Sequence, residues 1–311
     1  MSPAGGSWWP VAPSSEVRRN PVGLTRFGQQ FVFWRSNGRL VCMPDRCPHR
    51  GAALSLGRIK KASSTLACPF HGLEFAADGR CVRVPVDADP RLPEDFGVAT
   101  LPVREGDGYI WMWRGAGPAR DAELPSHPDT VQMRHGDAAG TWNAHYTRCI
   151  ENVCDFSHLP FVHRTTIGML PRETITRVEM EDVAGGFRAH LLDSNVRKQT
   201  LEFLYPNRWL LKLSSRIMLG LVFAPIDSTH TAVYGRTYYG FPMPGLGWFM
   251  DAYTRFSQFL VFREDWPIVA SQTPGDVLLA RDEKLLPSDA PIIAYRKLHR
   301  AHEGASAPAN V

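Results

Sequence analysis

The sequence predicts an α+β protein with an all-β first part and a second part that mixes strands with helices. Residues 17–113 contain short aromatic and β-branched runs between turn signals, the pattern of a small β domain. Residues 129–311 contain further strand-like runs and one long stretch with apolar residues at helical spacing. The residues between are rich in Pro, Gly and Ala. We therefore expect domains at 1–115 and 129–311, joined by a linker over 116–128.

A β-hairpin is the clearest element of the first part. Two apolar runs within residues 23–45 flank Asn37-Gly38, a dipeptide that favours the two-residue turn between antiparallel strands. Further strands are predicted for "GRCVRVPV" at 79–86 and "GYIWMWR" at 108–114.

The second part is predicted to contain strands followed by helices. Residues 177–194 and 230–243 predict strands joined by turns, and residues 246–265 have the length and spacing of a helix of several turns. Pro267 follows closely, so we expect this helix to kink or restart there. Residues 285–300 predict a turn followed by a C-terminal helix.

Composition excludes several classes of protein. The chain has 311 residues, 35 of them basic and 31 acidic, and its net charge of +4 is too balanced for a nucleic-acid binder. The longest apolar run, at 218–226, is about half the ~18 residues that span a bilayer. The first ten residues lack the pattern of a secretory signal. Six cysteines in a chain of this length fit a reducing cytoplasm in which some thiolates bind metal.

Two short motifs in the first part carry candidate metal ligands. "CPHRG" at 47–51 and "CPFHG" at 68–72 form the pattern C-x-H followed by C-x-x-H. A zinc site with two cysteines and two histidines is one interpretation. However, each motif pairs one Cys with one His, whereas zinc fingers usually pair like with like. Both motifs also end in glycine, as tight loops around a cluster need. The candidate ligands are Cys47, His49, Cys68 and His71.

The two motifs together resemble the Rieske [2Fe–2S] domain. The resemblance implies that Cys47 and Cys68 ligate one iron, and that His49 and His71 ligate the other. Respiratory Rieske proteins carry an extra cysteine in each loop, and those two cysteines form a disulfide. This chain lacks the pair, since Phe70 stands between Cys68 and His71. That favours Rieske ferredoxins and Rieske oxygenases. A ferredoxin could end near residue 115, whereas this chain continues to residue 311.

A second candidate metal site follows the pattern Asp155-x-x-His158-x-x-x-x-His163. On spacing alone, ordinary buried histidines are the favoured interpretation, and metal ligands are the alternative. Beside a Rieske domain, the segment resembles the iron-binding segment of Rieske non-haem oxygenases, which implies that His158 and His163 bind a mononuclear Fe(II). "LVFREDWPIVASQ" at 260–272 resembles the segment of small homotrimeric members, such as vanillate and dicamba demethylases, that supplies the carboxylate ligand. The resemblance implies Asp265 as that ligand, the alternative being a charged helix end.

Asp155 is expected to assist one of these histidines. It lies three residues before His158, within reach on one helical face. As a second carboxylate ligand it would leave too few open positions on the metal. We therefore expect it to accept a hydrogen bond from His158 and to orient that ring. The family resemblance implies more: Asp155 would link His158 to His71 of an adjacent chain in a head-to-tail trimer.

The resemblance implies a terminal oxygenase. Such a protein uses O₂ and electrons from a reductase or ferredoxin to hydroxylate or oxidatively demethylate a small organic substrate. Its fold would be a Rieske domain followed by a helix-grip (START-like) catalytic domain with an antiparallel sheet. The alternative is a Rieske-type electron-transfer protein with a non-catalytic second domain. An excess of basic residues could dock an acidic donor or form an ordinary solvated surface: Arg46, Arg50, Arg58, Lys60 and Lys61.

Overall fold

The computed structural model describes residues 6–86, 96–115, 119, 123–131, 133–166, 178–192, 199–240 and 247–303. Its contacts divide the chain into two compact units. One unit is Trp8–Arg114, and the other is Gly115–Val311 together with Met1–Ser7. Part of the predicted linker, residues 116–118 and 120–122, lies outside the described residues.

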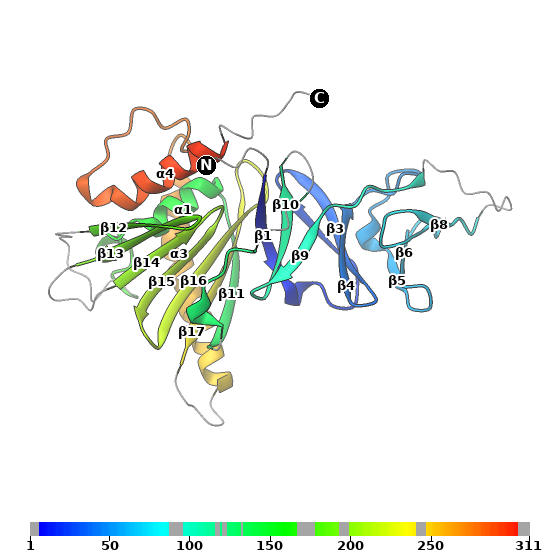
Figure 1. The fold of residues 1–311 in the computed structure, drawn as a ribbon, viewed down its shortest axis with the longest axis horizontal. Helices are drawn as coiled ribbons and strands as arrows, with labels where there is room; N and C mark the ends of the chain where they lie inside the picture. The colour runs from blue at the N-terminus through cyan, green and yellow to red at the C-terminus, as the bar shows by residue number, and fades with distance from the viewer. Residues whose placement is uncertain are drawn as a thin grey trace. The chain divides into compact units, whose positions relative to one another are not determined.

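The unit Trp8–Arg114 is built from three small sheets (Figure 1). The all-β prediction for this part is confirmed, but the predicted range of 17–113 starts too late, because one strand precedes residue 17. The sheets, in strand order, are β1 (Ser7–Pro13), β10 (Tyr109–Arg114) and β9 (Val103–Gly106); β2 (Val22–Arg26), β3 (Gln29–Ser36) and β4 (Arg39–Pro44); and β5 (Arg58–Lys60), β6 (Thr65–Ala67), β7 (Glu74–Phe75) and β8 (Cys81–Arg83).

Three tight turns join neighbouring strands in this unit. The predicted turn at Asn37-Gly38 is confirmed, with φ of 49° and 83°. Phe27-Gly28 and Asp107-Gly108 have the same pair of positive φ values, 53° and 76° in the first and 57° and 73° in the second. Positive φ at both central residues is the conformation that matches the twist of a two-residue hairpin. Glycine adopts it without steric cost, which explains its place in all three turns.

The other unit contains one seven-stranded antiparallel sheet (Figure 1). The apolar run at 218–226 lies, except for its last residue, in a strand of this sheet, where most of its side chains are buried. Within the described ranges, no helix is long and apolar enough to cross a membrane. The strands, in sheet order, are β11 (Arg134–Trp142), β17 (Thr231–Tyr239), β16 (Ile217–Pro225), β15 (Arg208–Ser214), β14 (Gln199–Leu204), β13 (Gly186–Leu191) and β12 (Val178–Val183).

Helices pack against this sheet: α1 (Tyr146–Cys154) on β16, α3 (Gly247–Ser271) on β11 and β17, and α4 (Ala290–Glu303) on β12 and β13. The short α2 (Leu159–Val162) follows α1. Gly136 lets α3 approach β11, since a Cβ there would lie 1.9 Å from Oγ1 of Thr254.

Helix α3 differs from its predicted form at its C-terminal end. It continues through Pro267 to Ser271, with no restart as a separate helix. Pro267 lies on the exposed side of the helix, where the loss of one backbone hydrogen bond costs least. Beyond it, Val269 is 1% exposed and belongs to the apolar core, so tertiary packing holds the final turn.

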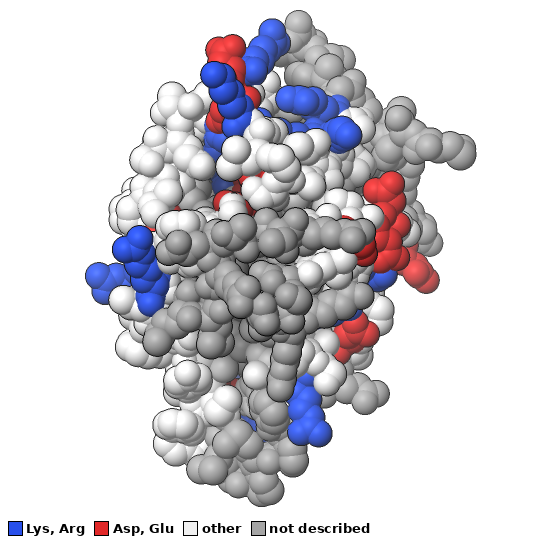
Figure 2. All heavy atoms as spheres, turned by 90° about the vertical axis from the view of Figure 1, so that its left-hand side faces the viewer, with Lys and Arg blue, Asp and Glu red and all other residues white. Residues whose placement is uncertain are grey.

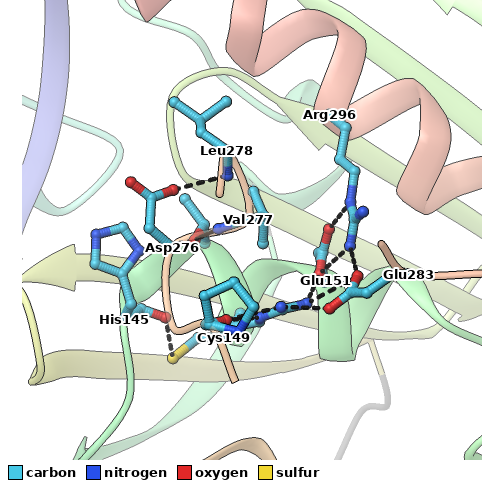
Figure 3. A network of polar contacts seen from close by, with 11 residues as sticks. His145, Cys149, Glu151, Asp276, Val277, Leu278, Glu283 and Arg296 are labelled. Atoms are coloured by element: carbon cyan, nitrogen blue, oxygen red, sulfur yellow. Dashed lines mark hydrogen bonds and ion pairs between the residues drawn. The ribbon is translucent and has the colours of Figure 1, made fainter. Parts of the chain in front are cut away.

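A buried ionic network joins α1 to α4 (Figure 3). Arg148 donates to Glu151 at 2.9 Å and to Glu283 at 2.5 Å, and its guanidinium also donates to the carbonyl of Pro274 at 2.7 Å and 2.9 Å. Arg296 of α4 donates to both carboxylates. The two arginine side chains are 3% and 7% exposed, so each relies on these acceptors in place of water.

His299 on α4 is buried among tyrosine rings. It is 2% exposed, stacks on Tyr295 at 5.7 Å between ring centroids, and its Nδ1 has no hydrogen-bond partner among the described residues. Burial lowers the pKa of His299 from 6.5 to about 4. The folded state therefore keeps this ring neutral, while the unfolded chain takes up a proton below pH 6.5.

We expect His299→Phe to reduce the acid sensitivity of the fold. Because the pKa of His299 is lowered in the folded state, the contribution of this residue to the stability of the fold is highest above pH 6.5. It falls as the pH drops from 6.5 toward 4, since only the unfolded chain takes up the proton in that range. Urea unfolding of the native chain should thus lose on the order of 2 kcal/mol between pH 7 and pH 5 through this residue. The variant should lose less over the same pH range. An equal pH dependence in the native chain and the His299 variant would contradict this.

Candidate active site

The two Cys/His motifs form loops with the same backbone hydrogen bonds. In the first, the amide of Cys47 donates to Ala52 at 2.8 Å, and that of Gly51 donates to Cys47 at 2.8 Å. In the second, Cys68 donates to Leu73 at 2.8 Å, and Gly72 donates to Cys68 at 3.1 Å. Gly51 and Gly72 have φ of 73° and 74°. Side chains other than glycine rarely adopt this conformation.

The side chains of these loops are arranged in two pairs. Cys47 and Cys68 are 2% and 4% exposed, and they are close enough for a hydrogen bond between thiols. The rings of His49 and His71 lie 4.6 Å apart between centroids, and both are more exposed. Burial raises the pKa of the Cys47 thiol to about 11. A sulfur pair beside an imidazole pair fits a two-iron cluster held by cysteines at one end and histidines at the other.

The segment around α2, together with α3, brings the second set of predicted ligands into one place. His158 precedes α2 and His163 follows it, and their Nε2 atoms lie 3.3 Å apart. Oδ1 of Asp265, from the buried face of α3, lies 3.1 Å from Nε2 of His163 and 3.6 Å from Nε2 of His158. The three side chains are 14% exposed or less. Two imidazole nitrogens and one carboxylate oxygen thus converge on a single point.

These three residues fit a metal ion by two observations. Their ligand atoms all lie within 4.8 Å of one another. In addition, Oδ1 of Asp265 is buried without a hydrogen-bond partner among the described residues, although two imidazoles lie near it. A buried carboxylate oxygen without a partner is costly, and a cation at this point would satisfy it.

The pKa values of this group reflect mutual stabilisation. Burial raises the pKa of Asp265, but His158 and His163 outweigh it and lower that pKa to about 2. Burial lowers the pKa of His163, but Asp265 and Glu264 outweigh it and raise that pKa. The carboxylate is therefore ionised at neutral pH, as a metal ligand must be.

Glu264 has a role that the sequence did not predict. Its carboxylate lies 2.7 Å from Nδ1 of His163 and accepts hydrogen bonds from Thr165 at 2.8 Å and Thr166 at 2.6 Å. Consecutive residues of a helix point about 100° apart, so Glu264 contacts one side of the His163 ring and Asp265 the other. This contact presents Nε2 of His163 toward Asp265 and His158. The sequence indicated this role only through the position of Glu264, which directly precedes the predicted ligand.

Asp155 does not make the predicted hydrogen bond to His158. Its Oδ2 lies 3.8 Å from Nδ1 of His158, beyond hydrogen-bonding distance. The other oxygen, Oδ1, accepts from the backbone amide of Ser157 at 2.6 Å and from its hydroxyl. Nδ1 of His158 is itself buried without a hydrogen-bond partner in the described part of the chain.

Replacing Glu264 with alanine is expected to weaken metal binding without emptying the site. Removal of a carboxylate that orients a metal-bound histidine typically costs ~10–100-fold in metal affinity. Metal titration of the chelated protein would measure it. Arg263→Ala is the control, because this neighbour is exposed and contacts neither histidine in the described structure. A metal affinity equal to that of the native chain would show that Glu264 does not position His163.

A cavity of about 200 Å³ opens beside the three converging side chains. The sheet contributes alternate residues of neighbouring strands, which point to one face, and α3 contributes one side of the helix. Most of the lining is apolar, which keeps the space poor in water. Besides the three converging residues, the lining comprises Val153, Asp155, Phe156, Leu159, Trp209, Leu211, Leu213, Ile217, Leu219, Leu221, Thr237, Tyr253, Thr254, Ser257, Gln258, Val261 and Phe262.

Comparison with known proteins gives two family matches and several relatives. Residues 7–102 match the Rieske [2Fe-2S] domain, and residues 142–304 match the vanillate O-demethylase oxygenase C-terminal domain. The chain is 30% identical over 184 residues to the vanillate O-demethylase oxygenase subunit of a Pseudomonas strain, covering 57% of this chain and 51% of that protein. It is 35% identical over 162 residues to chlorophyllide a oxygenase of Chlamydomonas reinhardtii, covering 51% of this chain and 24% of that protein. The matched region thus spans about half or less of these relatives.

Solved structures resemble the whole chain. NdmA of Pseudomonas putida CBB5, as a mutant with theobromine, superposes with a TM-score of 0.80 at 26% identity, covering 98% of this chain and 97% of that one. Dicamba monooxygenase bound to dicamba shares the fold, with a TM-score of 0.80 at 21% identity and 98% coverage of both chains. With both domains matched in the same order, the chain belongs to the Rieske oxygenases, as a member with a vanillate O-demethylase-type C-terminal domain.

Proposed function

We propose that this chain is a terminal oxygenase that uses O₂ and externally supplied electrons to hydroxylate, or oxidatively demethylate, a small organic substrate. The observation that carries the proposal is the convergence of His158, His163 and Asp265 at an apolar cavity. We assign these three side chains as ligands of a mononuclear Fe(II). We assign the four side chains of the Rieske loops to a [2Fe–2S] cluster, with Cys47 and Cys68 on one iron and His49 and His71 on the other.

The residues of the site support this chemistry. An iron held by two histidines and one carboxylate keeps open positions for O₂ and supplies the redox chemistry. Asp265 and Glu264 hold His163 from opposite sides, and the apolar lining excludes water from the reacting substrate. The relatives named as demethylase subunits favour monooxygenase or demethylase chemistry. The intact set of ligand side chains disfavours an electron-transfer protein with a non-catalytic second domain.

Metal analysis and a product screen test the proposal. Purified protein should contain three iron atoms and two acid-labile sulfides per chain, and it should release an oxidised product when supplied with a surrogate reductase and a panel of small methoxyaromatic compounds. Two iron atoms per chain would instead support the electron-transfer alternative. Zinc without labile sulfide would contradict the assignment of both metal sites.

The electron donor is proposed to be an acidic reductase or ferredoxin. On the cluster loops, the imidazole side is the exposed side, and Phe70 beside it is 57% exposed. Within residues 45–61, Asp45 is the one acidic residue among the basic residues Arg46, Arg50, Arg58, Lys60 and Lys61, but it is buried and accepts hydrogen bonds from Ser55. It therefore adds little negative charge to this surface. On the face in Figure 2, the described charges form small groups of both signs, which does not favour a nucleic-acid partner.

The assembly is proposed to be a head-to-tail homotrimer in the cytoplasm, with the domain limits predicted from the sequence. The six cysteines are free and buried, as a reducing compartment allows. A row of exposed aromatic side chains on α3 supports an interface, because such patches are uncommon on monomers. Light scattering should give a trimer, and a fully active monomer would contradict it. The row comprises Trp248, Phe249, Tyr253, Phe256 and Phe259.

Asp155→Asn is expected to keep both metal centres and to lose almost all product formation. In the proposed trimer, Asp155 links His158 to His71 of the partner subunit, and its 3.8 Å separation from His158 leaves room for a small adjustment to a hydrogen bond. The amide removes the charge that this link needs. Rapid mixing of the reduced variant with substrate and O₂ would measure reoxidation of the cluster. Reoxidation coupled to product at the native rate would rule out the linking role.

A further inference from the structure

The amide of Gln258 lies in the cavity lining with neither polar atom hydrogen-bonded in the described part of the chain. Gln258 on α3 is 4% exposed, and its two polar atoms are Oε1 and Nε2. Buried amides are nearly always hydrogen-bonded, so such a residue needs an explanation. The Thr254 hydroxyl, also in the lining, is already bonded to the carbonyl of Met250 at 2.8 Å.

The sheet makes room for this amide. Gly235 on β17 lies under it, and a Cβ at that position would come within 2.7 Å of Oε1 and 3.0 Å of Nε2 of Gln258. The same strand face carries Thr237, two residues on, which also lines the cavity. The amide therefore occupies a space that almost any side chain at position 235 would close.

The Gln258 end of the cavity offers no basic side chain. Among the described lining residues there is no lysine or arginine, so positive charge in the lining belongs to the assigned iron and the histidines that hold it, two helical turns from Gln258. A carboxylate, sulfonate or phosphate placed beside Gln258 would therefore lack a partner, which is costly in an apolar setting. A neutral molecule avoids that cost.

We propose that Gln258 recognises the substrate, and that the substrate is an uncharged, mostly apolar molecule with a hydrogen-bond donor beside an acceptor, as in a carboxamide or lactam. Oε1 would accept from the N–H of such a group while Nε2 donates to its carbonyl. Gln258 precedes Asp265 by seven residues on the same side of α3, about 10 Å along the axis. The polar edge is thus anchored two turns from the metal ligands, and the carbon to be oxidised lies at the opposite end. This inference rests on the proposed oxygenase function.

Binding of two matched probes tests the inference. Isothermal titration calorimetry without O₂ would compare 4-methoxybenzamide with 4-methoxybenzoate, which differ only in the polar edge and its charge. The native protein should bind the amide at least ~10-fold more tightly. Gln258→Met, similar in length and shape, should weaken amide binding about tenfold. Gly235→Ala should weaken it as well, by crowding the side chain of Gln258. Gln272→Met makes the same change at an exposed position of the chain and should leave binding unchanged.

The outcomes separate this inference from the proposed function. Equal or tighter binding of the benzoate, no binding of the amide, or an amide affinity that survives Gln258→Met would overturn the inference, even with three iron atoms per chain. Binding of the amide that depends on Gln258, in a protein with only two iron atoms per chain, would support the recognition role and contradict the oxygenase. Iron content should be equal in the native protein and in all three variants, because none of the altered residues is an assigned ligand.

Discussion

Asp265→Ala is expected to abolish product formation while the visible spectrum of the Rieske cluster stays normal. The change removes the one carboxylate oxygen that lies near both imidazoles, at 3.1 Å and 3.6 Å. Two histidines alone bind iron poorly, so we expect affinity at this site to fall on the order of 100-fold or more, beyond the range for residues that only orient a ligand. Iron analysis should then give two atoms per chain, and visible absorbance would report the cluster separately.

Glu264→Ala provides the matched comparison, since the two acidic residues are adjacent on α3. It leaves the converging atoms in place and removes the contact to Nδ1 of His163, together with the hydrogen bonds from Thr165 and Thr166. Its iron loss should therefore be partial. If Glu264→Ala empties the site and Asp265→Ala keeps its iron, the ligand assignment is off by one residue.

The sequence predicted those parts of the site whose residues are close together along the chain. His158 and His163 are five positions apart around a short helix, so their spacing alone brings them near each other. Asp265 lies about 100 residues further on, and only the family resemblance pointed to it. The contact of Glu264 with His163 was not predicted, because it depends on where α3 crosses the His163 loop. Gln258 went unnoticed for the same reason.

The fold was predictable where turn chemistry is strong. Asn37-Gly38 predicted its hairpin, whereas Phe27-Gly28 did not, because phenylalanine has no preference for the positive φ of 53° that it adopts there. Strands β14 and β15 were not predicted, and the run at 218–226 was noted only as too short for a membrane span. Continuous apolar runs do not distinguish a buried strand from a buried helix. Packing decided the end of α3, against the local effect of Pro267.

Glu151→Ala is expected to have the largest effect on stability. Glu151 lies in α1 ahead of the metal-binding segment, and nothing in its sequence position indicated that it is 4% exposed. It accepts hydrogen bonds from Arg148 and Arg296, which are themselves buried (Figure 3). Its loss leaves two buried guanidinium groups with Glu283 as the remaining carboxylate of the network, and the side chain of Glu283 is 31% exposed. Removing one partner of a buried ion pair typically lowers the free energy of unfolding by ~3–5 kcal/mol.

Urea unfolding would measure this loss, and two further variants make it specific to the buried charges. Glu283→Ala should cost less than Glu151→Ala, because water can reach the space that Glu283 vacates. Replacing Arg148, Glu151 and Arg296 together by methionine or leucine should recover much of the loss, since the one charge of the network then left, Glu283, is 31% exposed and reaches water. Because α1 ends at Cys154, directly before Asp155 and the histidines, Glu151→Ala should also release iron from the mononuclear site at lower urea concentration than the native chain. A Glu151→Ala protein that unfolds within about 1 kcal/mol of the native chain would show that the network contributes little and that apolar packing alone fixes α1 and the metal-binding segment that follows it.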